Sequence, residues 1–110
     1  MINITIYTDE KQECVGFNAI NHAGYAIAGQ DIVCAAVSMM LINTMNAIEQ
    51  FTDDETLVVS NEDDGLIDYR FDDDPCHDSR LLLNAMILGL KELAYDQNYE
   101  DYIKITFKEV

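Results

Sequence analysis

The chain has 110 residues, of which 49% are hydrophobic and 25% charged, a composition typical of one globular domain. We therefore expect a single domain over residues 1–110. Acidic residues number 21 and basic residues 6, which gives a net charge of −15. This balance argues against direct binding to nucleic-acid phosphates or to anionic membrane surfaces, and it favours a basic partner.

The charge is also unevenly distributed. Eleven of the acidic residues lie between Asp53 and Asp78, where Arg70 is the one basic residue. The first residues lack the cationic start and apolar stretch of an export signal, and the run Ile32–Ile42 is too short to span a bilayer. The three cysteines are odd in number and have no framework spacing, so we expect a cytoplasmic protein with reduced thiols.

The first third of the chain reads as a hairpin followed by a loop. Isoleucine alternates with polar residues over residues 2–7, which predicts a strand with one buried face. A polar turn separates it from a second strand in which Val15, Phe17 and Ala19 alternate. The stretch up to Gln30 has glycines near both ends and no periodicity, so it is predicted to be a loop.

A long helix is predicted next. Asp31 is a favourable N-cap residue, and the apolar pattern then continues to about Gln50. Apolar residues surround much of its first turns, so we expect this helix to be covered on more than one side, by another helix or by a second subunit.

Two further strands are predicted, starting at Leu57 and covering residues 67–71, with the favourable turn dipeptide Asp64-Gly65 between them. Asp74 and Pro75 are suited to the N-cap and first position of a second helix.

This second helix is expected to reach about Tyr95, and residues 103–107 alternate as a final strand. The predicted order is ββαββαβ. An α+β fold, a mixed sheet with two helices packed on one face, is the natural arrangement for that order.

His22 and Cys34 are the candidate catalytic residues. With Asp31 as N-cap, Cys34 would be the third helical residue, where the helix dipole and the first-turn N–H groups favour a thiolate and can stabilise an oxyanion. His22, in the preceding loop, would take the thiol proton and return it to a leaving amine. Cysteine and histidine in this setting predict a nucleophile that attacks a carbonyl carbon.

Asp31 has two alternative roles, as a helix cap or as a residue that orients His22, and a Cys–His dyad is the simpler expectation. A second interpretation treats Cys34 as a small buried hydrophobic residue among apolar neighbours.

Cys76 and His77 compete for the catalytic role, because they also lie near a predicted helix start. Adjacent helical residues point about 100° apart, so these two side chains are poorly placed to share a proton. They also lack the spacing of structural zinc ligands. We expect no metal and no cofactor, and a structural role for Cys14 early in the second strand.

Two segments together resemble the signature of the bacterial ribosomal-processing cysteine proteases. They are His22-Ala23-Gly24-Tyr25-Ala26 and Asp31-Ile32-Val33-Cys34-Ala35-Ala36-Val37-Ser38. The resemblance extends over nearly the whole chain in length and element order. Asn21 stands where these proteases usually have glycine.

The resemblance implies an α+β homodimer with Cys34 as nucleophile and His22 as base and acid. It implies a basic substrate, large-subunit ribosomal protein twenty-seven, from which an N-terminal extension is removed. Two other functions stay open on the residues alone. One is a non-catalytic acidic dimeric module that binds basic ribosomal proteins, and the other is a thiol redox sensor using Cys34 with Cys14 or Cys76.

Overall fold

The computed structural model describes residues 1–21, 28–61, 63 and 65–110. Within them the elements follow the predicted order ββαββαβ. They are β1 (Ile2–Thr8), β2 (Cys14–Asn21), α1 (Ala28–Phe51), β3 (Thr56–Asn61), β4 (Leu66–Phe71), α2 (His77–Ala94) and β5 (Ile103–Glu109).

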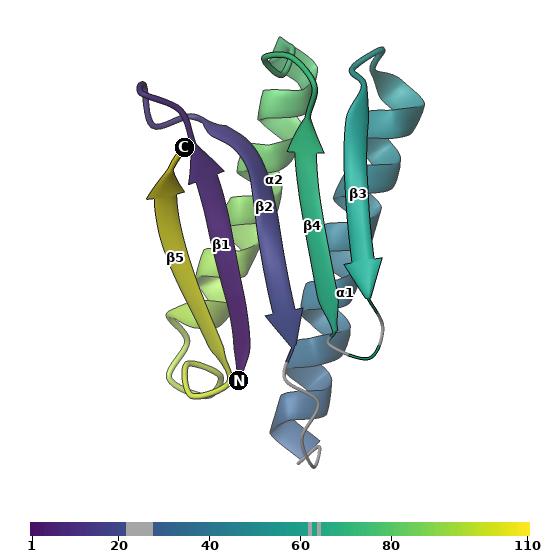
Figure 1. Ribbon diagram of the computed structural model, residues 1–110. Helices are drawn as coiled ribbons and strands as arrows, with labels where there is room; N and C mark the ends of the chain where they lie inside the picture. Colours follow the sequence, from purple (N-terminus) through teal and green to yellow (C-terminus); the bar gives the residue numbers. More distant parts are fainter. Residues whose placement is uncertain (22–27, 62, 64) are drawn as a thin grey trace.

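The five strands form one mixed sheet in the order β3-β4-β2-β1-β5. The pairs β1–β2, β2–β4 and β3–β4 are antiparallel, whereas β1 and β5 are parallel. Both helices lie on the same face of the sheet (Figure 1). The predicted fold class, α+β with two helices on one face of a mixed sheet, is confirmed, as is the hairpin of the first two strands.

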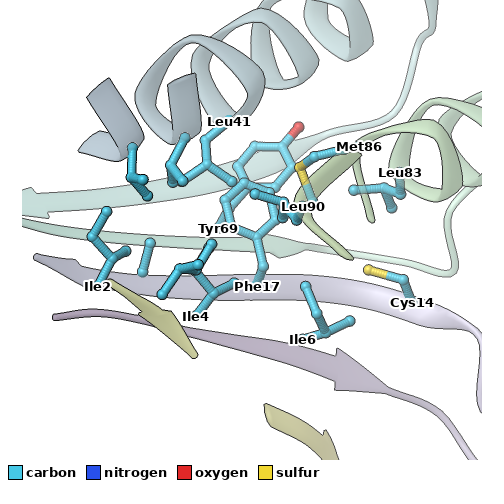
Figure 2. Close-up of a cluster of buried hydrophobic side chains, with 14 of the residues drawn as sticks. Ile2, Ile4, Ile6, Cys14, Phe17, Leu41, Tyr69, Leu83, Met86 and Leu90 are labelled. Carbon is cyan, nitrogen blue, oxygen red and sulfur yellow. The ribbon is translucent and has the colours of Figure 1, made fainter. Parts of the chain in front are cut away.

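The core lies between that face and the two helices. Phe17 and Tyr69, from β2 and β4, stack with their ring centroids 5.2 Å apart, and Phe71 meets Tyr69 edge-on at 5.4 Å. Figure 2 shows strand and helix side chains meeting in one cluster. Its largest fully buried members are Tyr69, Phe17, Ile2, Ile4, Ile6, Leu41, Ile48, Leu83, Leu90 and Val33.

A bulge near the start of β2 changes which residues face the core. Tyr7 pairs with Gly16 and the next residue of β1 pairs with Cys14, so Val15 is an extra residue between them. As a result Cys14 is buried while Val15 is partly exposed, and the expected alternation of Val15 with Phe17 is wrong at this position. Gly16 permits the bulge with its positive φ of 154°.

The start of α1 differs from the sequence prediction. The helix begins at Ala28, so Asp31 lies within the first turn and is not the N-cap. Cys34 is therefore the seventh helical residue and not the third. Alanine has the highest helix propensity, which favours a start at Ala28, although Gly29 in the first turn carries the entropic cost of glycine.

The buried side of α1 carries Val33, Val37, Leu41 and Ile48, which join the core against the sheet and α2. Cover by another helix, one of the two expected arrangements, is thus observed. The span Ile32–Phe51 is long and apolar enough to cross a membrane by length and composition alone, a property it shares with core helices of folded proteins.

The second helix begins at His77, two residues after Pro75, so Asp74 and Pro75 are not its cap and first residue as predicted. Cys76 is the N-cap, and its Sγ accepts a hydrogen bond from the Ser79 backbone N–H at 3.5 Å. Asp54 accepts from the Cys76 N–H at 2.9 Å and from the buried Ser79 hydroxyl at 2.6 Å. The connection after α1 is thereby held to the start of α2.

These contacts predict an acid-dependent loss of stability. The Ser79 hydrogen bond and then the Cys76 N–H hold the pKa of Asp54 below its usual value. A depressed carboxyl pKa contributes stability above the unfolded pKa of about 3.9 and loses it as pH falls through the folded pKa. We expect Asp54→Asn to unfold at a lower temperature than the parent at pH 7, with a gap that narrows towards pH 3. Melting curves across this range test it, and a gap independent of pH would contradict it.

Candidate active site

Cys34 lies on the second turn of α1, directly after the buried Val33. Its side chain is half-buried and packs against the core cluster. It is thus neither a fully buried hydrophobic residue nor a residue of the first turn. The expectation that first-turn N–H groups point past its sulfur has to be revised, because the helix starts earlier than predicted.

His22 lies outside the described residues, so its pairing with Cys34 stays a prediction. The backbone on either side of it is described. The sheet strand β2 ends at Asn21 and α1 begins at Ala28. Six residues reach at most about 20 Å when extended, so the end of β2 and the start of α1 lie at the same end of the molecule (Figure 1). The backbone of Asp31 belongs to the first turn of α1.

Cys76 and His77 do not form a dyad. The Cys76 Sγ accepts from the Ser79 N–H, and its thiol lies 3.6 Å from the Ser79 hydroxyl oxygen. The His77 ring turns to its other neighbour, with Nδ1 3.1 Å from Oδ1 of Asp78, and both side chains are exposed. The two candidates therefore have separate partners, which favours Cys34 as the reactive thiol.

Cys14 is buried in the core, where its thiol donates to the Gly16 carbonyl at 3.3 Å. Burial raises the pKa of Cys14 to about 11. The structural role expected from sequence agrees with this position. It also argues against Cys14 as the resolving partner of a redox sensor, because the thiolate is the reactive form.

A labelling experiment follows from this difference. At pH 8 a thiol with a pKa of about 11 is ionised to about one part in a thousand, so iodoacetamide should modify Cys34 and Cys76 in the folded protein and leave Cys14 unmodified. Peptide mass spectrometry before and after denaturation measures the three sites separately. Equal labelling of Cys14 and the exposed Cys76 in the folded protein would refute the assignment of Cys14 as an inert core residue.

Sequence reasoning missed a polar network on the face of the sheet opposite the helices. Asp68 accepts from the Tyr7 hydroxyl at 2.8 Å, from the Asn18 amide at 3.0 Å and from Arg70 Nε at 2.9 Å. The Arg70 guanidinium also stacks on the Tyr7 ring, 4.3 Å from its centroid. Burial disfavours the charge on Asp68, but the hydrogen bonds from Arg70, Asn18 and Tyr7 outweigh it and lower its pKa. The only sequence signal for this network was polar residues alternating with apolar ones.

No group of three or more metal-ligating side chains lies together in the part of the chain that the structure describes.

The sequence profile of the family described as Cysteine protease Prp matches residues 1–104. The Ribosomal processing cysteine protease Prp of Bacillus subtilis (strain 168) is 29% identical over 110 residues, covering 96% of each chain.

Two crystal structures of the ribosomal processing protease Prp from S. aureus have the same fold. One, in complex with a substrate peptide, superposes with a TM-score of 0.89 at 24% identity, covering 98% of this chain and 100% of the other. The second, with a covalently linked product peptide, has a TM-score of 0.85 at 25% identity and the same coverage. With a half-buried thiol on the helix that follows the connection carrying His22, and a family match over nearly its whole length, this chain belongs to the Prp family of cysteine proteases.

Proposed function

We propose that this protease removes the N-terminal extension of large-subunit ribosomal protein twenty-seven. Cys34 is the nucleophile, His22 the general base and acid, and Asp31 a residue that orients His22. The observation that carries the proposal is the partly exposed Cys34 on the helix that the His22 connection leads into, within a chain that matches the family over residues 1–104.

The proposed reaction has two steps. His22 takes the proton of the Cys34 thiol, the sulfur attacks the scissile carbonyl carbon, and the amine leaves with the proton from His22. The resulting thioester is hydrolysed by water, which His22 deprotonates, and the thiol is restored. A covalent step of this kind is in keeping with the product peptide that is covalently linked in the S. aureus protease.

The charge of the chain supports a basic substrate. A net charge of −15 creates a field that attracts a cationic protein and speeds its encounter by about 10 to 10³ at low salt. The same field repels the phosphates of nucleic acid and the anionic surface of membranes, so we propose no direct binding to either. We place the enzyme in the cytoplasm, where the three thiols stay reduced.

We propose that the working form is a homodimer. The outer side of α1 exposes a stripe of large apolar side chains, with Ile32 57%, Ile42 45% and Met39 68% exposed. Their spacing places them on one side of the helix, opposite Val33 and Val37. An apolar stripe of this kind is typical of a surface that a second copy covers.

The deciding experiment is mass spectrometry of the extended ribosomal protein after incubation with this chain. The proposal expects one new N-terminus and release of the extension as a single peptide. Binding of the ribosomal protein without cleavage, under reducing conditions, would instead support the non-catalytic acidic module.

A further inference from the structure

The outermost strand of the sheet, β3, leaves both of its faces and one of its edges open. Leu57, Val58 and Val59 are 59%, 48% and 49% exposed, and no residue of the strand is buried. The strand pairs with β4 on one side and, within the described ranges, with no strand on the other (Figure 1). Natural proteins usually block such an edge with charge, proline or a bulge, and β3 has none of these between Thr56 and Asn61.

The backbone groups that face the open edge follow from the pairing. The Glu55 carbonyl accepts from the Asp72 N–H at 3.0 Å, just before the strand begins. In an antiparallel ladder the hydrogen-bonded pairs recur at every second residue. Because Glu55 is hydrogen-bonded to the strand opposite, the next residues that bond to β4 are Leu57 and Val59. The other alternate residues therefore direct their N–H and C=O groups outward: Thr56, Val58 and Ser60.

The charges that flank β3 determine which kind of strand could pair with its open edge. The six residues of β3 are uncharged, whereas Asp53 and Glu55 are exposed before the strand and Asp63 is exposed after it. The nearest cation on β4, Arg70, is already paired with Asp68 at 2.9 Å. In an antiparallel pairing of two copies centred on Val58, Asp53 of one copy would lie opposite Asp63 of the other, and like charges opposite each other are destabilising.

We propose that the β3 edge is a docking strand for an extended, basic segment of a protein substrate, which adds to the sheet as a further strand. The middle of this segment is uncharged and apolar, so that it can lie beside Val58. The segment carries lysine or arginine on both sides of that middle, opposite the acidic residues that flank β3. Main-chain hydrogen bonds give such an addition its affinity and the flanking charges its selectivity. Only the identity of the natural occupant, the ribosomal protein, rests on the proposed function.

The position of β3 suits this role. It runs antiparallel to β4, which runs antiparallel to β2, so β2 and β3 end at the same end of the sheet. That is the end from which the connection carrying His22 leads to α1 (Figure 1). A segment docked along β3 therefore leads towards the end of the sheet where α1, the helix that carries Cys34, begins.

The test uses the Cys34→Ala protein, so that binding is measured without cleavage. The probe is a fluorescent peptide with six alternating valines and threonines, matching the length of β3, between paired lysines at each end. We expect saturable binding by fluorescence anisotropy, weakened by salt, and no binding of the same peptide with paired glutamates. Backbone amides of Val58 and Ser60 should gain protection from hydrogen exchange.

Val58→Pro is the discriminating variant, because it removes an outward donor and is tolerated where the N–H faces solvent at a strand edge. It should raise the Kd of the lysine peptide at least about tenfold while leaving the melting temperature nearly unchanged. The variant with Asp53→Asn, Glu55→Gln and Asp63→Asn should bind the lysine peptide more weakly and with a smaller salt dependence, without altering the strand.

Equal binding to Val58→Pro and to its parent would overturn the proposal, as would equal binding of the lysine and glutamate peptides. Lysine-peptide binding that Val58→Pro abolishes would support the docking strand even if the extended ribosomal protein is not cleaved. If cleavage occurs and the peptide does not bind, the docking strand is wrong and the proposed function stands. Self-association of the parent that Val58→Pro abolishes would instead assign the edge to a second copy.

Discussion

Replacing Cys34 with alanine should lower kcat for removal of the extension at least about 10⁴-fold, because the alanine side chain cannot form the thioester. Binding of the uncleaved substrate should change little, since one sulfur atom contributes little to a protein-sized interface. Single-turnover kinetics with the extended ribosomal protein measure the chemical step, and a pull-down or anisotropy titration measures binding. Cleavage by Cys34→Ala at the parental rate would eliminate the proposed mechanism.

The chain supplies its own matched control. Cys76→Ala removes an exposed thiol that also lies at the start of a helix, and it should leave kcat within about twofold of the parent. His22→Ala should lower kcat by about 10²- to 10⁴-fold, the usual contribution of a general base and acid. If Cys76→Ala loses activity while Cys34→Ala retains it, the nucleophile has been assigned to the wrong helix.

Replacing Gly16 with alanine should cause the largest loss of stability among conservative substitutions in this sheet. A Cβ at this position would lie 2.5 Å from the Tyr69 carbonyl oxygen, and the φ of 154° is one that other residues rarely adopt. The clash could be relieved only by moving the backbone of β4 or of the bulge, and either movement would break hydrogen bonds between the strands. We expect the free energy of unfolding to fall by about 2–4 kcal/mol and the melting temperature by about 10 °C or more.

Gly89→Ala is the control for this substitution. Its Cβ would come within 2.7 Å of the Met40 sulfur, which belongs to a flexible side chain, and alanine favours the helix by about 1 kcal/mol. We expect a melting temperature within a few degrees of the parent. Thermal unfolding followed by circular dichroism compares the two variants, and a Gly16→Ala protein as stable as Gly89→Ala would contradict the account of the bulge.

The arrangement of elements could be predicted because hydrophobic periodicity is a local property. Isoleucine at every second position of β1 requires one buried face whatever the rest of the chain does. Two long apolar helices then leave few ways to cover that face, and the α+β arrangement followed from this constraint.

The element boundaries depended on contacts that the sequence does not display. Cys76 caps α2 because Asp54, 22 positions earlier, holds its N–H and the Ser79 hydroxyl. Aspartate followed by proline is the commoner start, and the local pattern favoured it. In the same way, Cys14 reaches the core because of a bulge whose position depends on pairing between β1 and β2.

The candidate site was predicted to a different extent for each residue. Cys34 was identified from its residue type and its place in a motif, but its helical position was predicted four residues too early because Asp31 was taken as the cap. The Tyr7–Asp68–Arg70 network was not predicted at all. Its members come from β1 and β4, which lie on either side of β2, and this strand order is not visible in the sequence.

The parallel pairing of β1 with β5 has a consequence for synthesis of the enzyme. Ile2 and Ile103 are partners although they lie about a hundred residues apart, so their contact forms late and contributes to a high contact order. During synthesis, the edge of β1 that pairs with β5 stays unpaired until β5 has left the ribosome. The five-stranded sheet is therefore complete only once β5 has been synthesised and has paired with β1.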